Sequence, residues 1–128
     1  LQAANEVGPL KHGYYAPAIP SGKADNARAS AQIPATEPLL VLFDSTVFGS
    51  AKRCIVLTPH GLWAMWVNIL DMRRMINWEA FLAHPIERGF GRETIAVGGT
   101  KIVTHPSRRH DIQKFLQHLK AKAVVPLT

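Results

Sequence analysis

The pattern of hydrophobic and polar positions predicts a series of short strands through the middle of the chain, with a helical turn at residues 79–83. The run at residues 39–43 is apolar throughout, as expected of a strand buried on both faces or covered by a helix, and residues 54–58 and 62–67 are rich in β-branched and aromatic side chains. Pro59-His60-Gly61 and Gly98-Gly99 predict two tight hairpins, the second because both glycines accept positive φ. The predicted strands are residues 39–43, 54–58, 62–67, 73–78, 94–97 and 101–104.

Helical patterns lie on either side of these strands. Residues 23–30 are rich in helix formers, with Ser21 as the expected N-cap and Pro34 as the stop. A closing helix is expected over about residues 107–122, with Ser107 as its cap. Its apolar side chains recur at i, i+3, i+4 and i+7, so one face packs and the other meets solvent. They are Ile112, Phe115, Leu116 and Leu119.

This order of elements predicts a mainly β domain of the α+β class. We expect a bent antiparallel sheet or partly open barrel, in which the C-terminal amphipathic helix covers apolar interior at one opening. The expected organisation is an extended arm over residues 1–20, a short lead-in helix and linker over 21–38, and the sheet domain with its closing helix over 39–128.

Two turn segments carry a family resemblance. From Asp44 to Lys52 the chain reads DSTVFGSAK, in which an acidic residue and a Phe-Gly-Ser turn separate the first two strands. From Leu57 to Trp63 it reads LTPHGLW, in which a Thr-x-x-Gly turn leads into an aromatic-bearing strand. Together with Ile76-Asn77-Trp78 and the closing helix, these segments resemble the bacterial pleckstrin-homology-like (PH-like) domains.

The resemblance implies a seven-stranded, strongly bent sheet capped by a helix, in a fold used for binding and rarely for catalysis. Eukaryotic pleckstrin-homology domains bind phosphoinositides through basic residues on their first two strands and the loop between them. Here Lys52 and Arg53 open the second strand, but Leu42-Phe43-Asp44 ends the first, so that pattern is half present. The final helix offers Phe115 where those domains typically place a Trp. The resemblance therefore carries no lipid specificity.

Charge changes the picture by pointing to anionic partners. The chain has 128 residues and a net charge of +6, and residues 39–128 hold the whole excess, as twelve Lys and Arg against six Asp and Glu. Such an excess favours phospholipid headgroups, nucleic acid or an acidic protein surface.

Composition also bounds the setting of the chain. No apolar stretch approaches the roughly 18 residues of a membrane-spanning helix. Cys54 is the single cysteine, which excludes an internal disulfide and favours the cytoplasm. Because the first residue is Leu, we expect the chain to be part of a longer product or to have been trimmed.

The start of the closing helix is the best candidate for an anion site. Basic side chains there meet the positive end of the helix dipole, and a bound phosphate or carboxylate would relieve that conflict. The alternative is a solvated, basic helix end. The candidate residues are Lys101, His105, Arg108, Arg109 and His110, with Lys52, Arg53, Arg73 and Arg74 as secondary basic candidates.

The sequence offers no catalytic constellation. The histidines lack metal-ligand spacing, the carboxylates lack a spacing that pairs an acid with a base, and the glycines form no phosphate-binding fingerprint. We therefore expect no metal and no cofactor, and we expect Cys54 to be an inert core residue. Trp63, Trp66 and Trp78 could stack on bases, but a core role is expected for them.

These observations predict a non-enzymatic, PH-like interaction module that binds a protein or peptide partner. The alternative is electrostatic binding of anionic lipid headgroups or nucleic acid through a basic surface. A small hydrolase or transferase assembled from loops ranks last.

Overall fold

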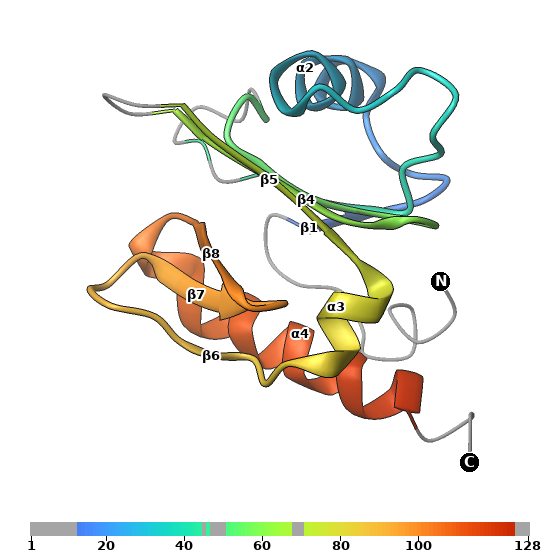
Figure 1. Cartoon of the computed structure of the whole chain (residues 1–128). Helices are drawn as coiled ribbons and strands as arrows, with labels where there is room; N and C mark the ends of the chain where they lie inside the picture. The colour runs from blue at the N-terminus through green and yellow to red at the C-terminus, as the bar shows by residue number, and fades with distance from the viewer. Residues whose placement is uncertain (1–12, 45, 47–50, 68–70, 125–128) are drawn as a thin grey trace.

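The computed structural model in Figure 1 describes residues 13–44, 46, 51–67 and 71–124. Its elements follow the predicted order, from a helical lead-in through antiparallel strands to a closing helix. They are β1 (Gly13–Tyr15), α2 (Ser21–Ala31), β2 (Val41–Asp44), β3 (Cys54–Thr58), β4 (Gly61–Val67), β5 (Asp71–Asn77), α3 (Trp78–Ala83), β6 (Glu87–Arg88), β7 (Thr94–Val97), β8 (Thr100–Val103), the 3-10 turn η1 (Pro106–Arg108) and α4 (Arg109–Val124).

The strands form two antiparallel sheets. The first is a meander in the order β1-β2-β3-β4-β5, and the second has the order β6-β7-β8. The prediction of an α+β fold with an antiparallel sheet is confirmed, but the strands do not close into a barrel. The division falls where α3 and Pro85 interrupt the extended chain between β5 and β6.

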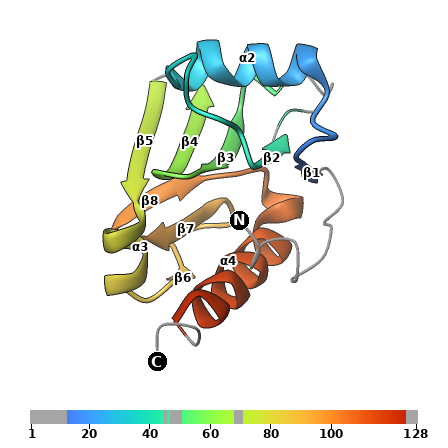
Figure 2. The same ribbon diagram turned by 90° about the vertical axis from the view of Figure 1, so that its right-hand side faces the viewer.

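The first sheet lies between two layers (Figures 1 and 2). The helix α2 covers one face, and the second sheet with α4 covers the other. Alternate residues of β2, β3 and β4 therefore enter two different cores, which explains why these strands are apolar apart from Asp44 and Thr58 at the ends of β2 and β3. The core under α2 contains Ala27, Ala31, Ile33, Leu39, Leu42, Ala51, Cys54, Val56 and Met65.

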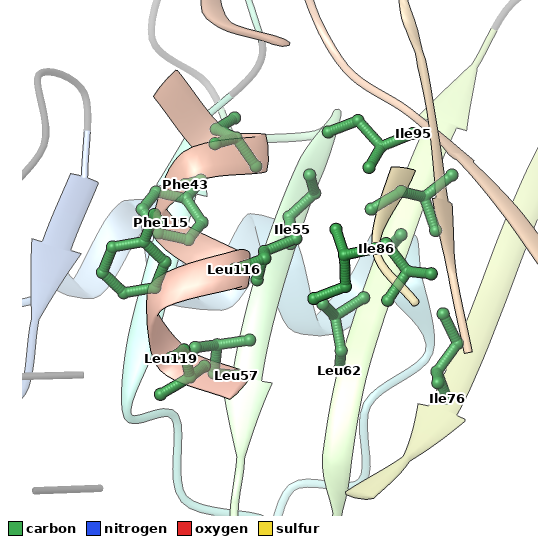
Figure 3. Packing of buried hydrophobic residues seen from close by; sticks show 14 of the residues in the cluster. Phe43, Ile55, Leu57, Leu62, Ile76, Ile86, Ile95, Phe115, Leu116 and Leu119 are labelled. Atoms are coloured by element: carbon green, nitrogen blue, oxygen red, sulfur yellow. The ribbon is translucent and has the colours of Figure 1, made fainter. Parts of the chain in front are cut away.

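The second core lies between the first sheet and α4 (Figure 3). Phe115 on α4 meets Phe43 edge to face at 5.0 Å and Tyr15 at 6.2 Å. The four apolar positions predicted on the closing helix are at most 3% exposed, so its expected buried face is confirmed. The terminal helix therefore packs on the meander and does not stand free of it.

Both predicted hairpins are present. Gly98 and Gly99 adopt φ values of +59° and +81°, as the second turn requires. In the first hairpin, Gly61 lies so close to the neighbouring strand β5 that an added Cβ would be 2.2 Å from the carbonyl oxygen of Ile76. The Thr-x-x-Gly turn of the family resemblance is thus described, whereas residues 45 and 47–50 of its Phe-Gly-Ser turn lie outside the described residues.

Both predicted helix caps are wrong. Ser21 is the first residue of α2, and Pro20 precedes it without a side-chain capping bond. At the closing helix, Pro106 occupies the first position of η1, where a missing N–H costs nothing. The cap is therefore His105, whose Nδ1 accepts a hydrogen bond from the Ser107 N–H at 3.2 Å.

Two short strands were not predicted. Residues 13–15, assigned to an extended arm, pair with β2 as β1, and Glu87–Arg88 pairs with β7 as β6. Element ends also differ: Trp78, expected in a strand, begins α3 because the Asn77 side chain accepts a hydrogen bond from the Ala80 N–H at 2.8 Å. Among the described residues, no helix is long and apolar enough to cross a membrane.

Candidate binding site

The secondary basic candidates meet at one end of the first sheet. The strand register places Cys54 beside Met65 and Met65 beside Arg73, so the starts of β3 and β5 lie in the same row. Lys52 and Arg53 precede β3 directly, and Arg73 and Arg74 lie on β5. Two basic pairs separated by about twenty residues in sequence therefore lie together in space.

Ser30, near the end of α2, joins the two pairs. Its Oγ donates a hydrogen bond to the carbonyl of Lys52 at 2.7 Å, and its own carbonyl accepts one from Arg73 Nε at 2.7 Å. The positive charge of Arg73 thus lies at the negative end of the α2 dipole, which stabilises that helix end. The contact fixes α2 relative to β5.

A surface hollow of about 260 Å³ lies between the end of α2 and β5. Its lining combines apolar and basic groups: Ala31, Gln32, Trp63, Arg73, Arg74 and Met75. Met75 is 44% exposed, and the half-buried Trp63 is oriented by a hydrogen bond from its Nε1 to Thr58 Oγ1 at 3.0 Å. The hollow therefore presents apolar surface, and two arginines are among its lining residues.

The outer edge of β5 is open beside this hollow. β5 is the last strand of the five-stranded sheet, and no described strand pairs with its far side. Figure 2 shows the end of α2 beside the start of β5 and no further element beyond that strand. The Arg73 carbonyl accepts a hydrogen bond from the Arg74 guanidinium at 2.9 Å. An edge strand of this kind is a surface on which a strand from another molecule can pair.

The three tryptophans are half-buried and held by neighbours. Arg53 lies over the Trp66 ring at 4.8 Å, a cation–π contact. Trp78 Nε1 donates to the carbonyl of Thr58 at 3.0 Å, and the ring meets Phe81 edge to face. Together with the bonded Trp63, this arrangement favours packing over base stacking.

The leading anion candidates have their own protein partners. The Arg108 guanidinium donates to the carbonyls of Asp44 and Thr46, and that of Arg109 donates to the carbonyl of Gly91. The two side chains therefore tie two separate loops to the start of α4.

The other three candidates are distributed around these arginines. His105 caps η1, His110 is exposed on α4, and Lys101 lies on β8 opposite Ala96. The structure records no contact that joins all five candidates, and anion binding at this helix start stays a prediction.

Asp44 is the buried acid that organises this end of the first sheet. Its side chain is 3% exposed and accepts hydrogen bonds from Lys23 Nζ at 2.7 Å, the Thr46 N–H at 2.9 Å and the Ala51 N–H at 3.2 Å. Burial alone would raise the pKa of the Asp44 carboxyl, but the bonds from Lys23 and Thr46 outweigh it and hold the pKa below its ordinary value.

The β3–β4 turn rests on a second acid. Glu37 is 7% exposed, and its carboxylate accepts hydrogen bonds from the His60 N–H at 3.3 Å and from His60 Nδ1 at 2.7 Å. A hydrogen bond from Thr58, followed by those from His60, lowers the pKa of Glu37 against the opposing effect of burial. This contact holds the turn in place beside Trp63.

Cys54 and the histidines do not form a reactive centre in the described part of the chain. Cys54 is fully buried, and burial together with the nearby Asp44 charge raises the pKa of its thiol to about 12. Its predicted core position is confirmed. Across residues 13–44, 46, 51–67 and 71–124, no three His, Cys, Asp or Glu side chains lie close enough to hold a metal ion.

Sequence reasoning missed the apolar part of the hollow. Met75 lies in a predicted strand but is not among the candidate residues. The available signal was the pattern Arg73-Arg74-Met75, in which basic and apolar residues share an edge strand. Comparison with protein-family models, curated proteins and solved structures finds no match to this chain.

Proposed function

We propose that this chain is a non-enzymatic, PH-like interaction module that binds an extended segment of a partner protein along β5. The observation that carries the proposal is the open edge of β5 beside a hollow that is both apolar and basic. In this mode the backbone of the edge strand gives affinity, and pockets for alternate side chains give choice.

The order of the elements supports the family assignment. Leaving out β1, seven strands in sets of four and three precede the closing helix, which is the strand number that the resemblance implies. The helix α2, on the far face of the first sheet, supplies one wall of the hollow. The cytoplasm is proposed as the location, on the ground of the single cysteine.

The lining of the hollow indicates the chemistry of the partner. Arg74 and Arg73 favour a carboxylate on the incoming segment, while Met75 and Trp63 favour an apolar side chain beside it. Because side chains of a strand alternate between faces, the partner segment is expected to carry an acidic and an apolar residue on the same face, two positions apart.

Selection from a random-peptide library, followed by amide chemical-shift mapping of the bound peptide, tests this function. The selected peptides are expected to be extended, acidic and apolar, and to shift the amides of β5 and of the end of α2. Arg74→Glu should weaken binding about tenfold, since it replaces an attractive charge by a repulsive one.

Phe90→Ser is the matched control, because it changes an exposed apolar residue outside the hollow. It should leave peptide affinity unchanged. Peptides that shift amides elsewhere, or that bind the Arg74→Glu variant as tightly as the original chain, would overturn the proposal.

Anionic surfaces remain the second candidate class, favoured by the excess of positive charge. Salt titration separates the two modes, because affinity from charge neutralisation falls steeply with salt, whereas strand addition with an apolar contact falls less.

A further inference from the structure

The connection between β6 and β7 carries an exposed aromatic side chain. Phe90 is 89% exposed, and with Met75 it is one of two exposed large hydrophobic residues in the described part of the chain. Figure 1 shows this connection projecting at the left of the second sheet, in the layer opposite α2. Scattered apolar residues on a surface are ordinary. A ring as exposed as this one at a projecting tip is a candidate for contact with a non-aqueous surface.

The loop is built to hold Phe90 outward. The Gly89 N–H donates to the carbonyl of Thr94 at 3.0 Å, and Thr94 Oγ1 donates to the carbonyl of Phe90. From the other side, the Arg109 guanidinium donates to the carbonyl of Gly91, whose φ of +80° turns the chain back. The exposed ring is therefore carried by a turn whose backbone is held by hydrogen bonds.

Basic side chains flank the ring on both sides. Arg88 and Arg92 are exposed, each two residues from Phe90, and the half-exposed Arg109 stands behind the loop. Two exposed acids, Glu87 and Glu93, lie one residue further out. In the second sheet Glu87 pairs with Ala96, and Ala96 pairs with Lys101, so the three residues lie in one row across the strands. The positive charge of Lys101 offsets part of the negative charge of Glu87.

We propose that the β6–β7 loop docks the protein on an anionic lipid surface by inserting Phe90 among the lipids. A projecting apolar tip suits a soft interface, which closes around it, and the flanking guanidinium groups suit the phosphates of the headgroups at the same depth. The loop belongs to the layer on the other side of the first sheet from α2, which forms one wall of the β5 hollow.

The expected attachment to the lipid surface is weak and needs both contributions, the charges of the arginines and the insertion of Phe90. Each arginine near an anionic surface contributes about a fivefold gain in affinity, and a partly inserted phenylalanine contributes about tenfold or more. Since one anchor alone gives marginal binding, removing either the ring or the charges should release the protein.

Sedimentation with vesicles tests the proposal. The full chain is mixed with vesicles of phosphatidylcholine alone or of phosphatidylcholine with phosphatidylserine, at low and at high salt. The expected result is binding to the anionic vesicles only, weakened about tenfold in Phe90→Ser and about 25-fold in the double variant Arg88→Gln/Arg92→Gln. Ala83→Ser, an exposed position outside both the loop and the hollow, is the control and should bind as the original chain does.

A second readout places the loop in the membrane directly. Lipids brominated near the headgroup should leave the tryptophan emission of the original chain unchanged. In Phe90→Trp they should quench the part of the emission that comes from the introduced indole ring. The proposal is overturned if the chain does not bind anionic vesicles, or if Phe90→Ser binds them as tightly as the original chain does. It is also overturned if a single-stranded oligonucleotide displaces the vesicles and binds Phe90→Ser with the same affinity as the original chain.

Discussion

Neutralising Asp44 should destabilise the fold by an amount that can be worked from its contacts. The carboxylate is nearly fully buried and accepts bonds from Lys23, Thr46 and Ala51. In Asp44→Asn the shape is kept but charge-assisted hydrogen bonds become neutral ones, and the new amide hydrogens face the Lys23 ammonium. Since hydrogen bonds to charged groups contribute about 1.5 to 3 kcal/mol, we expect a loss of about 2 to 3 kcal/mol.

The ion pair accounts for part of that loss. At 2.7 Å between Lys23 Nζ and Asp44 Oδ2, the Coulomb energy is about 6 kcal/mol for an effective dielectric constant near 20. Desolvation of the buried carboxylate offsets most of it, and the Lys23 side chain keeps 20% of its exposure to screening solvent. We expect a coupling energy of about 1 to 2 kcal/mol between the two residues.

Urea unfolding of four proteins measures this coupling: the original chain, Lys23→Met, Asp44→Asn and the double variant. Tryptophan fluorescence reports the transition. Lys23→Met should cost less than Asp44→Asn, because the carboxylate keeps its bonds from Thr46 and Ala51. Additive effects of the two substitutions, within about 0.3 kcal/mol, would refute the ion pair as a source of stability.

The same pair sets the pH window of its contribution. The folded pKa of Asp44 is lowered, so its contribution is present above the unfolded pKa of about 3.9 and is lost as pH falls through the folded value. The folded pKa of Lys23 is raised, since the bond and charge of Asp44 exceed the opposing effect of burial. Its contribution is present below the unfolded pKa of about 10.4 and is lost as pH rises through the folded value.

Three further predictions follow from burial and close approach. Phe115→Ala should cost about 3 to 5 kcal/mol in urea unfolding, since it removes a fully buried ring that meets Phe43 edge to face; a loss under 1 kcal/mol would contradict the packing. Gly61→Ala should destabilise the fold, whereas Gly22→Ala, at a position in α2 where an added Cβ meets open space, should leave the stability unchanged or raise it slightly, when both are measured by thermal unfolding. Cys54 should react with a thiol reagent at neutral pH only as fast as the protein unfolds enough to expose it. Rapid modification of the folded chain would contradict the burial of the thiol.

Much of the fold could be predicted because its strands are buried on both faces. Residues 54–57 are apolar throughout, since alternate side chains enter the core under α2 and the core under α4, and no solvent-facing position interrupts the run. The face of the closing helix could likewise be read from its spacing.

The missed strands lack any local signal. β1 consists of the three residues Gly13–Tyr15, shortly before Pro17, and it exists only because β2 supplies hydrogen-bond partners nearly thirty residues later. β6 has two residues and owes its extended form to β7. Pairing over such distances overrides local propensity.

The candidate site could be predicted only in part. The secondary basic pairs were visible in the sequence, but their meeting depends on the bond from Arg73 to the carbonyl of Ser30, which joins residues 43 positions apart. The arginines at the closing helix were equally visible, yet each donates to a backbone carbonyl of a distant loop. Which basic groups border a hollow and which tie down loops is decided by tertiary contacts.

Amide hydrogen exchange along β5, with and without a selected peptide, tests the central claim most directly. The account predicts that alternate amides of Asp71–Asn77, those on the open edge, exchange quickly in the free chain and become protected when the peptide is bound. The amides of β3, already paired on both sides, should not change. Protection that arises elsewhere while β5 continues to exchange as in the free chain would contradict the account.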